Sequence, residues 1–272
     1  MTAINTNVGA LNARLYTLSA NNAQEKAMER LSSGKRVNSA ADDAAGLAVA
    51  GKMESQLRGI NMAIRNNQDG VGLIQTAEAG INEVRNMVLR IRELAVQMAN
   101  GIYEDSPDRA NAQLEVEALQ AQVNLIAGYT RFNDVSLLNG SFSAVDIQAG
   151  NTTSETIALT ITTMTTTGLG FDSVSVSTQS NAQAAITTMD TALTDIATEQ
   201  ATLGSYINRL NYSIANLSKS SVMTEQALGR IMDADFASET TQLSKSQILN
   251  QAATSMLAQA NQSKQSILAL LQ

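Results

Sequence analysis

The fold is decided by residues 186–231, ITTMDTALTDIATEQATLGSYINRLNYSIANLSKSSVMTEQALGRI. Steps of three and four residues from Ile186 reach fourteen positions, and eleven of them are apolar. Only Gln200, Ser221 and Thr224 interrupt the pattern. This spacing is the seam of a coiled coil, so it predicts one long helix packed along others. The apolar seam positions are Ile186, Met189, Leu193, Ile196, Leu203, Ile207, Leu210, Ile214, Leu217, Leu228 and Ile231.

A second long helix is predicted from Ser39 to Asn100-Gly101. Ser39 is the expected cap, and Asp42 and Asp43 would lie in the first turn, where the helix dipole favours carboxylates. The helix would hold about 60 residues and measure about 90 Å, which requires an elongated bundle. Six glycines within it indicate close approach to other segments or a bend. Its seam is Ile81, Val84, Val88, Ile91, Ala95, Met98 and Ile102.

A third helix should restart at Ser106-Pro107, with Ser as its cap, and should end at Asn133-Asp134. The segment at about 140–180 differs in character, because Ile157, Leu159 and Ile161, and then Val174 and Val176, alternate with polar residues. This pattern predicts two or three short hairpin strands. The expected fold class is mainly α: an elongated helical bundle or coiled coil from both chain halves, with a small β-hairpin element.

Both ends of the chain repeat apolar residues at heptad spacing but carry almost no charge. Residues 1–24 contain Arg14 and no acid, and residues 241–272 contain Lys245 and Lys264 and no acid. Short helices without charge pairs are marginal alone in water, so packing against other copies should order them. The predicted assembly seam of the termini consists of Ile4, Val8, Leu11, Leu15, Leu18, Leu257, Ala260, Ile267 and Leu271.

Composition argues against most kinds of chemistry. The chain lacks cysteine and histidine, which excludes thiolate nucleophiles, His-based triads and the usual zinc sites. Carboxylate pairs occur at Asp42/Asp43 and Asp233/Asp235, and a helix start explains the first of them. No catalytic, cofactor-binding or metal site is expected. The net charge of −7 gives no general attraction to nucleic acid or anionic lipid. Neither a cleavable secretory signal nor a membrane-spanning segment is expected.

Several motifs resemble those of one family, the bacterial flagellins. LSSGKRVNSAADDAAGLA at 31–48 resembles the N-terminal flagellin signature, as do NVGAL at 7–11 and RELAVQMANG at 92–101. YTRFND at 129–134 and QILNQAATSMLAQANQ at 247–262 resemble later blocks of the family, in the same order. The resemblance covers nearly the whole chain and is weakest at about 140–180.

The resemblance implies a secreted, extracellular subunit that polymerises into the flagellar filament for swimming motility, after export in the unfolded state through the flagellar type III channel. It implies an inner-tube domain from residues 1–42 and 233–272, a helical bundle domain at 43–232, and no variable outer domains. The implied partners are other copies of the chain, the flagellar cap, hook-associated junction proteins and an export chaperone.

The resemblance also implies a possible contact with the host Toll-like receptor that senses flagellin. Arg90, Leu94 and Glu115 match the contact positions of the family, whereas Leu89 replaces the polar residue expected beside them. The same residues can equally serve the bundle and the contacts between subunits.

Three alternative functions compete with the flagellin interpretation. A flagellin-like hook–filament junction protein shares the terminal patterns, but the match through 31–48 and the receptor-like segment favours flagellin. A coiled-coil adhesin or secreted effector would not need charge-poor heptads at both termini. An enzyme is the weakest alternative, because no nucleophile–base pair can be assembled.

Overall fold

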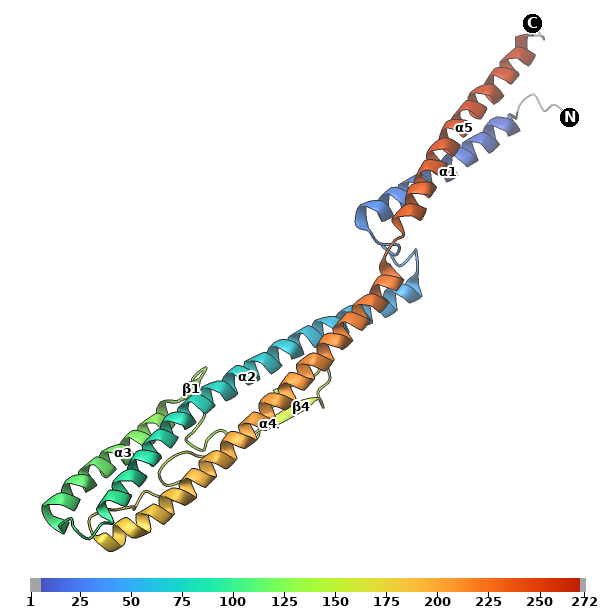
Figure 1. Cartoon of the computed structure of the whole chain (residues 1–272). Coiled ribbons are helices and arrows are strands. Elements are labelled where there is room, and N and C mark those ends of the chain that lie inside the picture. Colours follow the sequence, from blue (N-terminus) through green and yellow to red (C-terminus); the bar gives the residue numbers. More distant parts are fainter. Residues whose placement is uncertain (1–5, 270–272) are drawn as a thin grey trace. The chain divides into compact units, whose positions relative to one another are not determined.

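The computed structural model describes residues 6–269, with side chains described as far as Ser263. In this part of the chain, long helices pack against one another and short strands form two small sheets, as predicted for a mainly α fold (Figure 1). The helices are α1 (Val8–Ser33), α2 (Ala44–Met98), α3 (Ala110–Tyr129), α4 (Gln179–Met232) and α5 (Phe236–Ala269). A π-helical turn, η1 (Asp105–Arg109), precedes α3.

The chain divides into two compact units. One comprises residues 1–57 and 222–272, and the other comprises residues 58–221. The long helices α2 and α4 each contribute to both units.

The unit 58–221 holds the apolar core, formed by α2, α3, α4 and the segments between α3 and α4. The seam predicted on α4 is confirmed there, because every seventh residue from Met189 to Leu210 is at most 1% exposed. The seam of α2 is buried from Ile81 to Met98. Ile102 was predicted to continue it but lies beyond the end of α2 and is 77% exposed. Each buried aliphatic side chain contributes about 1.5–3 kcal/mol to folding, so this seam dominates the stability of the unit.

The start of α2 differs from the prediction. Ser39 lies in a turn ahead of the helix, and its backbone N–H and hydroxyl both donate to the carboxylate of Asp42. Asp43 immediately precedes Ala44, and its Oδ1 accepts a hydrogen bond from the backbone N–H of Gly46 at 2.8 Å. Asp43 is therefore the capping residue, because a carboxylate at this position both accepts the free N–H and complements the helix dipole.

The cap predicted at Ser106 is not formed, because Glu104 precedes η1 and no side chain caps this turn by a hydrogen bond. The third helix does restart near Ser106-Pro107, through η1, in which Ser106 has an extended conformation. It ends at Tyr129, earlier than expected, because Asn133 and Asp134 form the turn of a hairpin instead. This hairpin pairs β1 (Arg131–Phe132) with β2 (Val135–Ser136). Asn133 and Asp134 have φ of 47° and 63°, the left-handed conformation that a two-residue hairpin turn requires and that Asn and Asp tolerate.

The second hairpin pairs β3 (Val145–Gln148) with β4 (Thr156–Leu159), so the strand predicted at Ile157 and Leu159 is confirmed. Val174 and Val176 do not form a strand. The backbone N–H of Val176 instead donates to the side chain of Gln113 on α3 at 2.7 Å. The Gln113 side chain thus accepts the backbone hydrogen bond that a neighbouring strand would otherwise accept. The alternation of apolar and polar residues at 174–176 reflects the full burial of Val176 and not a strand.

Glycine and asparagine residues of α2 let the β3–β4 turn lie directly on the helix. The side-chain amides of Asn66 and Asn67 donate to the backbone carbonyls of Gln148 and Ala149 at 3.3 and 3.1 Å. A Cβ added to Gly59 would lie 1.6 Å from Oδ1 of Asn151. Close approach, one of the two roles inferred for the glycines of this helix, therefore applies to Gly59.

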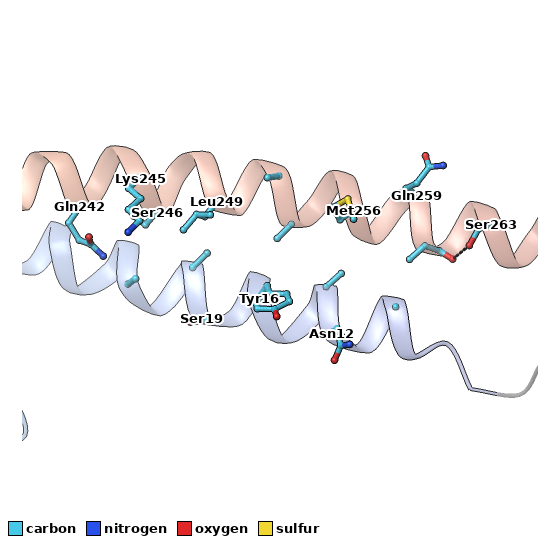
Figure 2. Close-up of a pocket in the computed structure, with 17 residues that line it drawn as sticks. Asn12, Tyr16, Ser19, Gln242, Lys245, Ser246, Leu249, Met256, Gln259 and Ser263 are labelled. Atoms are coloured by element: carbon cyan, nitrogen blue, oxygen red, sulfur yellow. Dashed lines mark hydrogen bonds between the residues drawn. The ribbon is translucent and has the colours of Figure 1, made fainter. Parts of the chain in front are cut away.

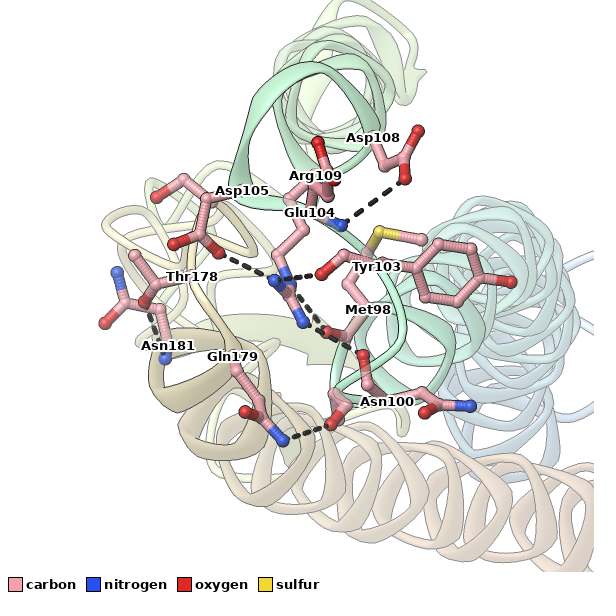
Figure 3. Close-up of polar contacts among 12 residues, drawn as sticks. Met98, Asn100, Tyr103, Glu104, Asp105, Asp108, Arg109, Thr178, Gln179 and Asn181 are labelled. Carbon is pink, nitrogen blue, oxygen red and sulfur yellow. Dashed lines mark hydrogen bonds and ion pairs between the residues drawn. The ribbon is translucent and has the colours of Figure 1, made fainter.

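Arg109 closes the end of the bundle where α2 stops. Its guanidinium is 4% exposed and donates to the backbone carbonyls of Met98, Asn100 and Tyr103 at 2.7–2.9 Å (Figure 3). It also pairs with the carboxylate of Asp105 at 2.7 Å. One buried cation thus satisfies carbonyls that the helix end leaves unpaired, where the helix dipole favours positive charge.

Replacing Arg109 by Met should lower the free energy of unfolding by about 3 kcal/mol, because the three carbonyls stay buried without donors. Urea denaturation followed by circular dichroism measures this change. Arg131→Met removes an exposed guanidinium and should change the same quantity by less than about 0.5 kcal/mol. Equal effects of the two substitutions would contradict the role given to Arg109.

Candidate assembly surface

Helices α1 and α5 pack side by side and run antiparallel, because Asn7 contacts Ala260 whereas Arg30 contacts Glu239. They contact each other mainly through small side chains (Figure 2). Ala13, Ala20 and Ala27 of α1 are 6%, 6% and 2% exposed. Opposite them, Ser246 and Ala253 are buried and Leu257 and Ala260 are half-buried. Burial of a methyl group contributes only about 0.8 kcal/mol, so this seam stabilises the pair far less than the seam of α4 stabilises the core.

Polar contacts supplement the alanine seam at three levels. The side-chain amide of Asn7 donates to the backbone carbonyl of Ala260 at 3.1 Å. The amide of Asn250 donates to Oδ1 of Asn21. Arg30 and Glu239 form an ion pair at 3.0 Å, with side chains 30% and 13% exposed. These contacts link segments more than 200 residues apart and hold the two termini together.

The segments next to the pair are joined by backbone hydrogen bonds. Gly34 ends α1 with φ of 69°, a conformation in which glycine avoids the steric cost of a side chain. Its carbonyl accepts from the N–H of Ala234 at 3.0 Å, and the N–H of Arg36 donates to the carbonyl of Met232 at 2.6 Å. The ends of α1 and α5 are thereby anchored to each other.

The apolar repeat that the sequence indicates on α1 faces outward. Val8, Leu11, Leu15 and Leu18 are 57%, 52%, 65% and 51% exposed, and we call them the α1 stripe. At about 100° per residue, the stripe lies almost opposite the alanine seam. The sequence pattern predicts that the α1 stripe packs against the apolar repeat of α5, but the residues of α1 that contact α5 are alanines. This row of alanines was not predicted from the sequence, because alanine gives a weak hydrophobic signal.

The other residues of the predicted seam are distributed differently. Leu257 and Ala260 face α1 and are half-buried within the pair. Ile4 and Leu271 lie outside the described residues, as does the side chain of Ile267. The α1 stripe is therefore the part of the predicted seam that the structure shows to be available to another molecule.

A groove of about 780 Å³ runs between α1 and α5 beside the alanine seam. Its walls are mainly small residues, and its largest apolar side chains, Tyr16, Leu249 and Met256, are 50–71% exposed (Figure 2). Among the described residues that line it, Lys245 is the charged one. Because the groove and the stripe lie on different faces of α1, the pair presents two distinct apolar surfaces.

The three residues that match receptor-contact positions lie in the other unit. Arg90 donates to Glu115 at 2.8 Å across α2 and α3, and both side chains are about half exposed. This hydrogen bond, with a second one to Glu93, raises the pKa of Arg90. Leu94 is 4% exposed and belongs to the core. The structure thus brings Arg90 and Glu115 together at the surface and places Leu94 beneath it.

Within the described residues we find no group of Asp and Glu side chains able to hold a metal ion. None of the described helices is both long and apolar enough to cross a membrane.

The sequence that contains this surface is similar to known protein families and structures. Residues 4–143 match the bacterial flagellin N-terminal helical region, and residues 186–271 match the bacterial flagellin C-terminal helical region. A flagellin of Halalkalibacterium halodurans is 40% identical over 270 residues, covering 98% of this chain and 99% of that protein. Flagellin FlaB1 of Treponema pallidum is 41% identical over 285 residues, with the same coverage of both chains.

Solved structures resemble parts of the chain. Bacillus cereus flagellin has a TM-score of 0.51 and 32% identity, covering 56% of this chain and 88% of that one. A putative flagellar hook-associated protein from Vibrio parahaemolyticus has a TM-score of 0.57 over 71% of this chain and 100% of that one. Its identity is 14%, so the second similarity concerns the fold alone.

The turn before α2 should make the stability of the monomer depend on pH. Hydrogen bonds from Ser39, then from Asn38 and Lys26, lower the pKa of Asp42 below its ordinary value of 3.8. A carboxylate with a lowered pKa stabilises the folded state above its unfolded pKa, and this contribution is lost as the pH falls through the lowered value.

We therefore expect Asp42→Asn to lower the melting temperature at pH 7, and the difference from the natural chain to shrink as the pH falls through the lowered pKa of Asp42. Thermal unfolding followed by circular dichroism between pH 7 and 2.5 measures both. Asp69→Asn, at an exposed position of α2, controls for the loss of one negative charge. A difference that persists at low pH would show that the charge of Asp42 is not what stabilises the turn.

Proposed function

The chain belongs to the bacterial flagellins, structural subunits of the extracellular flagellar filament and not enzymes, and on this premise we propose that the α1–α5 pair carries contacts between copies. The observation that supports this proposal is the exposed α1 stripe. Four aliphatic side chains in line, each more than half exposed, are unusual on the surface of a monomer and are typical of an interaction site.

The stripe and the groove fit a head-to-tail arrangement. A contact between two different surfaces of the same protein generates an open helical polymer when the rotation does not close. We propose that the α1 stripe of one copy packs into the α1–α5 groove of the next. Tyr16, Leu249 and Met256 offer apolar area there, and the unbranched side chain of Met256 can adjust to the incoming leucines.

The low charge of residues 1–24 and 241–272 supports burial of the remaining faces of these two segments. Asn, Gln, Ser and Thr side chains can hydrogen-bond to a neighbouring copy, whereas a buried unpaired charge would be costly. We propose that residues 1–42 and 233–272 form the inner tube of the filament and that residues 43–232 form the next shell.

We also propose that the α1–α5 pair contacts other proteins of the flagellum. An exposed apolar pair needs to be covered before assembly, which supports an export chaperone as its earlier partner. The cap and the hook-associated junction proteins are proposed to contact it at the ends of the filament. A junction protein as the identity of this chain is not favoured, because whole-length flagellins are about 40% identical to it.

Leu15→Asp should abolish growth of filaments from seeds, because it places a charge in the proposed apolar contact. Leu15 is 65% exposed, so the melting temperature of the monomer should stay within about 2 °C of the natural value. Electron microscopy and sedimentation measure growth, and the concentration of unpolymerised protein should rise at least about tenfold, equivalent to about 1.4 kcal/mol.

Leu15→Met is the matched control, since it keeps an apolar side chain of similar volume and should polymerise normally. Normal growth of the Leu15→Asp protein would exclude the α1 stripe from the contacts between copies.

We also propose that Arg90 and Glu115 form the part of the surface that the flagellin-sensing Toll-like receptor contacts. Their half-exposed, paired side chains support this role, with Leu94 acting from the core by fixing the helix. Arg90→Ala should reduce receptor activation by monomeric protein about tenfold, as expected for loss of about 1.4 kcal/mol.

Arg92→Ala is the control for the receptor experiment, because Arg92 forms a similar exposed ion pair with Asp190 at 2.6 Å. A cell reporter of receptor activation, with monomer folding checked by circular dichroism, compares the two proteins. Equal activation by the Arg90 variant and the natural chain would remove Arg90 from the contact.

A further inference from the structure

The apolar contacts between α1 and α5 do not by themselves define how the two helices are aligned. Small residues recur every seven positions on both helices, so sliding one helix by a heptad places a small residue opposite a small residue again. The repeated residues are Ala13, Ala20 and Ala27 on α1, and Ser246, Ala253 and Ala260 on α5. The seam is therefore compatible with several alignments.

From residue 243 to residue 257, the other seam position of α5 is occupied by leucine, except at one residue. Asn250 occupies the seam of α5 with Leu243 seven residues before it and Leu257 seven residues after it. Its side-chain amide donates to Oδ1 of Asn21, and both asparagines are half-buried. Two amides that face each other satisfy a donor and an acceptor in a place where water is partly excluded.

A slide of one heptad in either direction would separate this pair. Asn21 would then face Leu243 or Leu257, which offer no hydrogen-bonding group. Asn250 would face Arg14 or Met28 in place of Asn21. A partly buried amide without a partner destabilises the slid alignments, whereas the alanine contacts remain equivalent in all of them.

We propose that the Asn21–Asn250 pair is the contact that determines the alignment of α1 and α5. A single polar pair in an apolar seam is known to set the alignment of coiled helices, at some cost in stability. The ion pair of Arg30 with Glu239 and the backbone contacts at Gly34 agree with this alignment, but they lie at one end of the pair. The asparagine pair acts inside the seam.

The alignment matters for assembly through the function proposed above. A slide of one heptad moves the α1 stripe by about 10 Å along α5. The stripe and the far wall of the groove would then no longer match those of a correctly aligned neighbour. This consequence rests on the proposed role of the α1 stripe, whereas the alignment itself can be measured without any polymer.

Disulfide trapping in the full-length monomer tests the proposal, and the chain offers a background without cysteine. A Cβ at Gly9 lies 3.5 Å from Cβ of Ala260, within the range of a disulfide. Gly9→Cys with Ala260→Cys therefore reports the observed alignment. Gly9→Cys with Ala253→Cys, and Tyr16→Cys with Ala260→Cys, report slides of one heptad in the two directions.

Each cysteine pair is placed in the natural chain, in Asn21→Leu/Asn250→Leu, and in the control Asn22→Leu/Gln251→Leu, whose positions are exposed. After equilibration in a glutathione redox buffer, mass spectrometry of tryptic peptides measures the fraction of each disulfide. In the natural and control chains we expect only the pair for the observed alignment to close. In Asn21→Leu/Asn250→Leu we expect at least one slid pair to close at least tenfold more than in the natural chain.

Slid pairs that stay open in Asn21→Leu/Asn250→Leu would overturn the proposal and assign the alignment to the contacts near Gly34 and Arg30. Seeded growth of Asn21→Leu/Asn250→Leu without added cysteines is measured in parallel and should be at least tenfold slower than natural. If the slid pairs close while growth stays normal, the alignment proposal holds and the role proposed for the α1 stripe fails.

Discussion

The structure depends on the contrast between two seams of the same helical geometry but different side chains. Along α4 and α2 the seam consists of large aliphatic residues, whose burial supplies most of the stability of residues 58–221. Between α1 and α5 the most buried residues are alanines and a serine, which let the helices approach closely and contribute little burial. The first seam forms a continuous apolar core. The second leaves a pair of helices whose larger apolar side chains point outward.

This contrast explains how far the sequence could predict the fold. The seam of α4 was predictable because its large residues repeat over many turns, and no competing pattern fits them. The end of α3 was not, because whether Asn133 and Asp134 end a helix or turn a hairpin depends on pairing between strands of only two residues. The false strand at Val174 and Val176 arose in the same way. Gln113, distant in sequence, supplies the hydrogen bond that a partner strand would have supplied.

The candidate site was predictable in part for a related reason. The apolar repeat of Val8, Leu11, Leu15 and Leu18 is evident in the sequence, but its direction depends on the alanine line beside it. Alanine differs so little from polar residues in hydrophobicity that its seven-residue repeat is not noticed without coordinates. Arg109 was missed for another reason. Its role depends on three backbone carbonyls near the end of α2, and the position of backbone groups cannot be inferred from residue types.

The small side chains of the α1–α5 seam have a consequence for the dynamics of the monomer. Helices held by methyl groups and a few polar contacts open locally at a lower free energy than a bundle held by leucine and isoleucine. Amide hydrogens of α1 and α5 should therefore exchange with solvent in a separate, faster class from those of residues 58–221. Such a chain has more than one unfolding equilibrium, so a single melting temperature describes its parts unequally. In this respect the monomer combines one unit with a large aliphatic core and a pair of helices held by smaller contacts.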